Sequence, residues 1–213
     1  MDNPNVIYFL IAVISYLIGS VPWAFIIGRM NGVDIREHGS GNVGATNVRR
    51  VLGKKLGILC FLLDFLKGFI PAAAVLNINR YASINLSEDI GFIICAFAVV
   101  AGHMWPVFLK FKGGKGVSTM AGILLALAPF SLLIGGAVWA LFFYSFRYVS
   151  LASIFAALSL PVSAYFLSKY KIYDMSDTLQ LILIILAALV IFRHKSNIIR
   201  LMKGTENRFS RKK

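Results

Sequence analysis

Lysine and glycine alternate in a short segment, FKGGKG (111–116), that lies between two long apolar runs. Glycine lets backbone N–H groups approach a ligand closely and lysine adds positive charge, so this composition is typical of a phosphate-binding loop. The next apolar run predicts a helix whose N-terminus would face the same anion. A Walker A loop is excluded, because that motif needs a glycine six residues before its lysine and a hydroxyl residue after it. Lys115 has Leu109 and Gly116 there, so Lys115 and Lys112 are candidate phosphate ligands of another kind of loop.

A second glycine-rich segment, REHGSGNVGATNVRR (36–50), follows the first apolar run. Its glycines alternate with small hydroxyl and amide side chains, which can donate hydrogen bonds, and two arginines close it. The candidate ligands here are Ser40, Gly41, Asn42 and Arg49. Either loop alone is more often a turn than a site. Two such loops that both carry cations predict that phosphate groups bind on one face of the protein.

Polar residues also mark two later segments, SFRYVSLAS (145–153) and RHKSNIIRLMKGTENRF (193–209). In the second segment, residues spaced three apart share one face of a predicted helix. That helix is amphipathic, which also suits a position at the membrane surface. The candidates from the two segments are Ser150, His194, Asn197, Arg200 and Glu206.

Three further titratable residues lie within or at the end of apolar runs. His103 ends one run just before Trp105 and Pro106 and is another candidate ligand. Asp64 and Lys67 are one helical turn apart inside a run, where an unpaired charge is costly. The spacing therefore predicts that they form an ion pair that stabilises the packing.

The elements that position these residues are membrane helices. The chain of 213 residues is 58% hydrophobic, with a mean hydropathy of +0.76, which excludes an ordinary soluble domain. A bilayer core needs about 20 apolar residues per helix. Seven apolar runs predict an all-α integral membrane bundle of about seven transmembrane helices in a single domain over residues 1–213, and they cover residues 5–28, 56–78, 90–109, 117–128, 130–146, 150–168 and 178–192. Pro129 favours the division between the fourth and fifth runs.

Basic residues are sorted along the chain in a way that predicts its orientation. The formal net charge is +13, which by itself would also suit a nucleic-acid-binding protein. With the N-terminus outside and seven crossings, however, 18 of the 22 Lys and Arg residues fall on the inner side. Arg80, Lys169 and Lys171 fall outside, and Lys67 lies within a span. This is the positive-inside pattern of a membrane protein, with the C-terminus in the cytoplasm. Cys60 and Cys95 lie in apolar runs without metal-ligand spacing, so no metal site is predicted.

Four motifs in order give the chain a resemblance to a known family. GSVPWAFIIGR, GSGNVGATN, GHMWPVFLKFKGGKGV and RHKSNIIRLMKGTE together resemble the acyl-phosphate-dependent glycerol-3-phosphate acyltransferases, the PlsY family. The match runs from Gly19 to Glu206, nearly the whole chain. The one visible departure is Trp105, where phenylalanine is commoner in the family, and both residues are aromatic.

The resemblance implies a reaction and a location. A fatty acyl group would pass from acyl phosphate to the sn-1 hydroxyl of glycerol 3-phosphate, giving lysophosphatidic acid and phosphate, as the first acylation step of bacterial phospholipid synthesis. The enzyme would lie in the plasma (inner) membrane in contact with membrane lipid, with its site facing the cytoplasm. No cofactor, CoA or acyl-carrier protein is implied. Because acyl phosphate is already activated, positioning and charge stabilisation would suffice without a covalent acyl-enzyme.

The resemblance also implies roles for the candidate residues. The acyl-phosphate head would be bound by Ser40, Gly41 and Asn42. Glycerol 3-phosphate would be bound and oriented by Arg49, Lys112, Ser150, His194 and Asn197. Of these, the catalytic candidates are Lys112, Ser150, His194 and Asn197. Further substrate-binding candidates are His103, Lys115 and Glu206.

Rival functions differ in the residues they need. An acyltransferase of the HxxxxD type needs an aspartate five residues after a histidine, and His38, His103 and His194 are followed there by Val43, Phe108 and Ile199. A CDP-alcohol phosphotransferase needs clustered aspartates, which the chain lacks. The alternative that stays open is a membrane transporter of a phosphorylated or other anionic substrate, for which cations beside membrane glycines would line a pathway. A transporter of this kind usually shows repeats between its halves, and none is visible.

Overall fold

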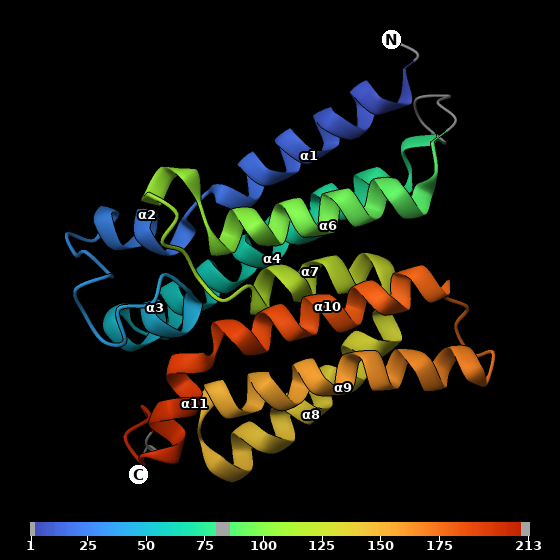
Figure 1. Ribbon diagram of the computed structural model, residues 1–213. Helices are drawn as coiled ribbons and strands as arrows, with labels where there is room; N and C mark the ends of the chain where they lie inside the picture. The colour runs from blue at the N-terminus through green and yellow to red at the C-terminus, as the bar shows by residue number, and fades with distance from the viewer. Residues whose placement is uncertain (1–2, 80–85, 210–213) are drawn as a thin grey trace. The chain divides into compact units, whose positions relative to one another are not determined.

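The computed structural model describes residues 3–79 and 86–209, and every regular element in these ranges is a helix (Figure 1). This confirms the predicted all-α class. The helices form two compact units, Met1–Leu127 and Ala128–Lys213, which are described separately. The first unit contains α1 (Pro4–Ser20), α2 (Trp23–Met30), α3 (Ala45–Leu52), α4 (Lys54–Leu76), α6 (Glu88–Met104), the 3₁₀ helix η1 (Val107–Leu109) and α7 (Val117–Leu127). The second contains α8 (Pro129–Phe146), α9 (Val149–Lys169), α10 (Asp177–Arg193) and α11 (Lys195–Met202). Arg80, predicted to lie outside, is not among the described residues.

Five helical segments among the described residues are long and apolar enough to cross a membrane. They are Pro4–Met30, Lys54–Leu76, Glu88–Leu109, Pro129–Phe146 and Val149–Lys169. Asp177–Arg193 and Lys195–Met202 make a sixth if the 55° bend between them lies within one span. All seven predicted runs are largely helical. The first (5–28) is interrupted at Val21 and Pro22, between α1 and α2, and the third (90–109) at Trp105 and Pro106, between α6 and η1. The seventh crossing would depend on α7, whose 11 residues rise only about 17 Å, little more than half of a bilayer core.

Local sequence explains where several of these helices begin. Ser87 Oγ accepts a hydrogen bond from Ile90 N at the start of α6, and Ser176 Oγ accepts one from Leu179 N at the start of α10. Pro129 occupies the first turn of α8, where its missing N–H costs nothing. The predicted division at Pro129 is thus confirmed: α7 ends at Leu127 and α8 begins two residues later.

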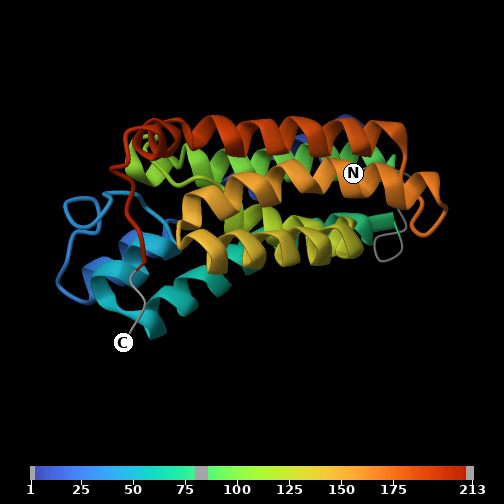
Figure 2. The ribbon, with the colours of Figure 1, turned by 90° about the horizontal axis from the view of Figure 1, so that it is seen from below.

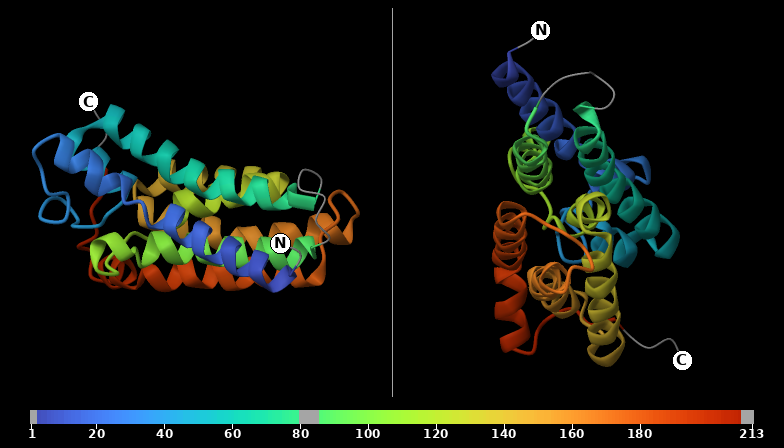
Figure 3. Two further views of the ribbon diagram at one scale, coloured as in Figure 1. Left: turned by 90° about the horizontal axis from the view of Figure 1, so that it is seen from above. Right: turned by 90° about the vertical axis from the view of Figure 1, so that its right-hand side faces the viewer.

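Glycines let the helices of the first unit approach closely. α1 packs along α6, as the views of Figure 3 show, and α4 packs along α7. A Cβ at Gly19 of α1 would overlap the backbone oxygen of Val99, and one at Gly122 of α7 would overlap that of Phe65 in α4. In a membrane, where burial of apolar surface does little to hold helices together, such backbone contact supplies the packing energy.

The second unit is held mainly by aromatic and aliphatic side chains. α9 packs against both α8 and α10, and the three helices run side by side in Figure 2, coloured yellow to red. Phe142 of α8 stacks on Phe155 of α9 with ring centroids 3.9 Å apart. Trp139 Nε1 donates a hydrogen bond to Ser153 Oγ at 3.3 Å, so the buried indole N–H has a partner.

The glycine contacts predict a matched pair of stability effects. Gly122→Ala should lower the free energy of unfolding by about 1–3 kcal/mol, because the new methyl group meets the backbone of α4, which cannot rotate away. Gly136→Ala in α8 is the control, since its Cβ would have nothing within 4 Å. That variant should be unchanged or slightly more stable, because alanine favours a helix. Thermal unfolding in detergent measures both, and equal melting temperatures for the two variants would contradict the packing argument.

Candidate functional site

The first glycine loop is folded around one buried side chain, Asn47. Its Oδ1 accepts a hydrogen bond from Ser40 N at 2.8 Å, and its Nδ2 donates to Ile35 O and His38 O at 2.9 and 3.0 Å. Gly39 has a φ of +63°, and a Cβ there would overlap Asn47 Oδ1. The loop that carries Ser40 therefore takes its shape from Asn47, a residue of α3 that the sequence did not single out as functional.

Two arginines near this loop are held by an internal carboxylate. Arg36 binds both oxygens of Asp34, with Nη2 2.6 Å from Oδ2, and Arg29 Nη2 lies 3.0 Å from the same oxygen. Hydrogen bonding to Arg36, followed by weaker attraction to both guanidinium groups, outweighs burial and lowers the pKa of Asp34. Both guanidinium groups also lie over the ring of Phe25. Their charge is thus partly neutralised. Arg49, the predicted ligand, lies exposed on α3.

The second glycine loop is seated on the end of α6. Gly113 N donates to Met104 O at 3.2 Å, and Gly114 N donates to His103 O at 3.0 Å. These two amides therefore complete the helix end, rather than pointing at a ligand as the sequence suggested. Lys112, exposed, and Lys115, half-buried, flank the two glycines.

The two glycine loops touch each other. A Cβ at Gly114 would lie 2.7 Å from the backbone oxygen of Val43, and both residues line one small pocket. Segments about 70 residues apart in sequence are therefore neighbours in the first unit.

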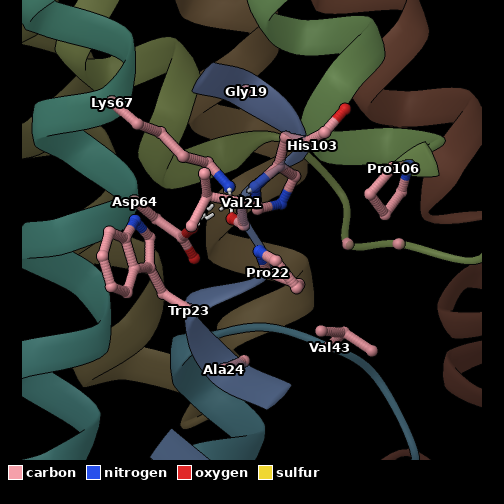
Figure 4. Close-up of a pocket in the computed structure, with 13 residues that line it drawn as sticks. Gly19, Val21, Pro22, Trp23, Ala24, Val43, Asp64, Lys67, His103 and Pro106 are labelled. Carbon is pink, nitrogen blue, oxygen red and sulfur yellow. Dashed lines mark hydrogen bonds and ion pairs between the residues drawn. The ribbon is translucent and has the colours of Figure 1, made fainter. Parts of the chain in front are cut away.

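Beneath the loops lies a buried polar network, which Figure 4 shows converging from α4 and α6 on the break between α1 and α2. Lys67 Nζ lies 2.8 Å from Asp64 Oδ1 and donates a hydrogen bond to Val21 O at 2.9 Å. The predicted ion pair is thus confirmed. His103 Nδ1 lies 3.6 Å from Asp64 Oδ1 and 3.1 Å from Thr119 Oγ1. His103, predicted as a substrate ligand, is buried here with Nδ1 directed toward α4 and α7.

In the second unit, one carboxylate gathers the predicted polar residues. Glu206 Oε1 accepts hydrogen bonds from Ser150 Oγ at 2.9 Å and from Asn197 Nδ2 at 2.7 Å. Its Oε2 accepts one from Arg200 Nε at 2.8 Å. Burial alone would raise the pKa of Glu206, but the hydrogen bonds from Asn197, Arg200 and Ser150 lower it below its ordinary value. The predicted residues Ser150, Asn197 and Glu206 are therefore brought together.

His194 stands at the bend between α10 and α11. Its Nδ1 lies 2.7 Å from Val190 O, and a backbone carbonyl can only accept a hydrogen bond. Nδ1 must then carry the proton, so in the neutral ring Nε2 is the acceptor. A neutral His194 is suited to accept a hydrogen bond from a hydroxyl group.

Sequence reasoning missed two organising residues, Asn47 and Thr119. The only signal for Asn47 was an amide directly after the glycines, at the start of a helix; Thr119 has an ordinary position in an apolar run. As for metals, the part of the chain that the structure describes holds no group of three His, Cys, Asp or Glu side chains able to bind an ion.

Comparison with known proteins identifies what this arrangement resembles. The family described as glycerol-3-phosphate acyltransferase matches residues 9–204. A glycerol-3-phosphate acyltransferase of Aquifex aeolicus is 44% identical over 93% of this chain and 97% of its own length. One of Wolbachia pipientis is 40% identical over 94% and 98%. Crystal structures of the integral membrane glycerol 3-phosphate acyltransferase PlsY, in glycerol 3-phosphate and lysophosphatidic acid forms, superpose with TM-scores of 0.83 and 0.81. Each is 42% identical and covers 95% of this chain, and 96% and 95% respectively of the PlsY chain.

The Glu206 cluster predicts a stability effect that depends on pH. Glu206→Gln should destabilise the protein by about 1.5–3 kcal/mol near neutral pH, because a charged acceptor of three hydrogen bonds becomes an amide whose NH₂ faces other donors. Glu37→Gln, an exposed carboxylate, is the control and should be neutral. Thermal unfolding in detergent gives both values.

The sign of the pH dependence follows from the lowered pKa of Glu206. A carboxylate whose pKa is lower in the folded protein stabilises the folded state at pH values above its ordinary pKa of about 4.5. This stabilisation is lost as the pH falls through the pKa that the group has in the folded protein. The stability gap between wild type and Glu206→Gln should therefore narrow on acidification. A gap that widens or stays constant would show that the charge is not what stabilises the cluster.

Proposed function

The chain belongs to the glycerol-3-phosphate acyltransferase family, and from this premise we propose that it transfers a fatty acyl group from acyl phosphate to the sn-1 hydroxyl of glycerol 3-phosphate. The hydroxyl oxygen forms a bond to the acyl carbon, and the bond from that carbon to the donor's phosphate oxygen breaks. The hydroxyl proton passes to the departing phosphate, so lysophosphatidic acid and phosphate are the products. The observation that carries this proposal is the family match along residues 9–204, whose relatives include a structure in its glycerol 3-phosphate form.

The polar residues of the first unit suit the phosphate groups. Lys112 and Lys115 flank the glycines of one loop, and Ser40 and Asn42 belong to the loop that touches it. Phosphate is a multiply charged acceptor, and a lysine ammonium binds it as a point charge. Ser40, Gly41 and Asn42 are proposed to bind the acyl-phosphate head. Arg49 and Lys112 are proposed to bind glycerol 3-phosphate, with Lys112 also near the reacting groups, where it stabilises the developing charge.

The polar residues of the second unit suit the glycerol hydroxyls. Ser150 donates its one hydroxyl hydrogen bond to Glu206, so toward a substrate its oxygen is an acceptor. His194, with its proton on Nδ1, also offers an acceptor. Glycerol 3-phosphate carries two hydroxyl donors. In this proposal Ser150, His194 and Asn197 orient the hydroxyls, and Glu206 positions Ser150 and Asn197 instead of touching substrate.

No covalent intermediate is needed for this reaction. The acyl phosphate is activated, and the two thiols, Cys60 and Cys95, are buried in helices of the first unit. Catalysis is then positioning of the two substrates, together with stabilisation of developing negative charge by fixed cations.

The assignment of acyl phosphate as the donor is tested by supplying it as the only acyl donor. Purified protein should form lysophosphatidic acid from acyl phosphate and labelled glycerol 3-phosphate without added metal, CoA or acyl-carrier protein. The control replaces acyl phosphate with acyl-CoA. Product from acyl-CoA and none from acyl phosphate would overturn the donor assignment while leaving the acceptor intact.

Charge stabilisation predicts the behaviour of variants at Lys112. Lys112→Ala should lower kcat by about 10² to 10³, the usual loss for one preorganised donor to developing charge. Lys112→Arg keeps the positive charge but carries it on a planar guanidinium group instead of a compact ammonium. Its activity should therefore lie between those of Lys112→Ala and wild type. Steady-state kinetics on detergent-solubilised protein measure both, and Lys110→Ala is the neighbouring control, expected to change kcat little.

His194 separates this mechanism from general-base catalysis. If the donor phosphate takes the hydroxyl proton, His194→Gln should keep measurable activity. The pH profile of wild-type activity should then show no loss between about pH 8 and 5.5 that follows protonation of an imidazole. Complete inactivity of a variant that still binds substrate, with a wild-type limb near pH ~6.5, would establish a histidine base instead.

Topology is the remaining part of the proposal: seven crossings, the N-terminus outside, and the site facing the cytoplasm of a bacterial inner membrane. Single cysteines at the exposed positions Glu37 and Lys203 should then react with an impermeant reagent from the cytoplasmic side, and one at Ile172 from outside. The background carries alanine at Cys60 and Cys95, which are buried. Labelling of Ile172→Cys and Glu37→Cys from the same side would refute seven crossings.

A further inference from the structure

The loop that carries Lys112 and Lys115 rests directly on the His103 ring. A Cβ at Gly114 would overlap His103 Nε2, and one at Gly113 would overlap the backbone oxygen of His103. The hydrogen bonds from Gly113 N and Gly114 N to the last carbonyls of α6 hold the backbone in this contact. A rotation of the imidazole would therefore displace the glycines, and with them the lysine on either side.

The orientation of that ring is set from its other edge. His103 Nδ1 lies 3.1 Å from the hydroxyl of Thr119, which is fully buried near the start of α7. Asp64 Oδ1 lies 3.6 Å from the same nitrogen. Asp64 is held in turn by Lys67, whose ammonium also binds Val21 O where α1 is interrupted. Figure 4 shows Asp64, Lys67 and His103 meeting at Val21, in the break between α1 and α2.

The backbone around the network is rigid, because α4 and α7 are in contact at this level. A Cβ at Gly68 would overlap the backbone oxygen of Thr119, and Gly68 directly follows Lys67. The backbones of α4 and α7 therefore hold Thr119 close to the turn of α4 that carries Asp64 and Lys67. An arrangement that only neutralised a buried lysine would need Asp64 and nothing more, whereas here the network continues through His103 to the loop.

We propose that Thr119, His103 and Asp64 are positioning residues that hold the 112–115 loop in the geometry that binds substrate phosphate. The inference rests on the proposed function, since it takes Lys112 as a ligand of glycerol 3-phosphate. Displacing a substrate-binding group by about 1 Å can cost orders of magnitude in rate, so the orientation of a ring beneath the loop matters even though the ring does not touch substrate.

Thr119 offers a matched pair of variants to test this. Thr119→Val keeps the shape of the side chain and removes the hydroxyl, whereas Thr119→Ser keeps the hydroxyl and removes a methyl group. Thr119→Val should raise KM for glycerol 3-phosphate about tenfold, which corresponds to 1.4 kcal/mol, close to the net contribution of one hydrogen bond. Thr119→Ser should stay within about twofold of wild type. Kinetics with acyl phosphate as donor, together with thermal unfolding, give KM, kcat and the folded fraction.

The change in KM separates positioning from a purely structural role. A network that only stabilises the fold would reduce the amount of active protein, lowering apparent kcat for both variants and leaving KM unchanged. That result, or an equal rise in KM for Thr119→Val and Thr119→Ser, would overturn the inference. If Thr119→Val does not accumulate as folded protein, His103→Asn replaces it. This variant keeps a polar atom near the position of Nδ1 but removes the ring edge under Gly114, so an unchanged KM for it would also refute positioning.

The failure of this inference can be told apart from failure of the proposed function. Wild-type protein that makes no lysophosphatidic acid from acyl phosphate would refute the donor in the proposed function. Wild-type activity with a Thr119→Val variant of unaltered KM would refute only the positioning role.

Discussion

In the first unit, a buried lysine, Lys67, binds a backbone carbonyl that an interrupted helix leaves without its usual partner. Inside a membrane protein every backbone carbonyl released by a helix break and every buried charge needs a partner within the protein. Lys67 donates to Val21 O where α1 gives way to α2, and Asp64 neutralises the ammonium at 2.8 Å. The break at Val21 and Pro22 is thereby stable, and the chain can turn into α2 and the first glycine loop. The same carboxylate, Asp64, lies next to His103, and the second glycine loop packs against the His103 ring.

Glycine has two structural roles in this protein, and neither is the one its motifs first suggest. In the helices, Gly68 and Gly122 let the backbones of α4 and α7 come into contact. In the loops, Gly113 and Gly114 fit against His103 while their amides bond to the end of α6. Glycine there permits close packing, and in the proposed function the lysines beside it bind the anion. The composition of a phosphate loop is retained, but its amides serve the fold.

The candidate residues divide by chemistry between the two units. The loops of the first unit carry the lysines, which suit phosphate groups. The cluster of the second unit centres on Glu206, which accepts hydrogen bonds from Ser150 Oγ and Asn197 Nδ2, so that toward any other group the serine oxygen is an acceptor. A single carboxylate therefore changes what a neighbouring serine can bind.

The sequence by itself determined the class of the protein, its apolar helices, the division at Pro129 and the pairing of Asp64 with Lys67. These follow from composition, periodicity and a spacing of one helical turn, which are local properties of the chain. Family motifs extended this to membership of the glycerol-3-phosphate acyltransferase family and to a set of candidate residues. Only the tertiary structure decided that Val43 lies against Gly114, that Asn47 shapes the first loop, that Thr119 faces His103 and that Glu206 joins Ser150 to Asn197. Most of those contacts join distant segments of the chain, and which partner a buried polar group finds depends on how the helices pack, which no local pattern encodes.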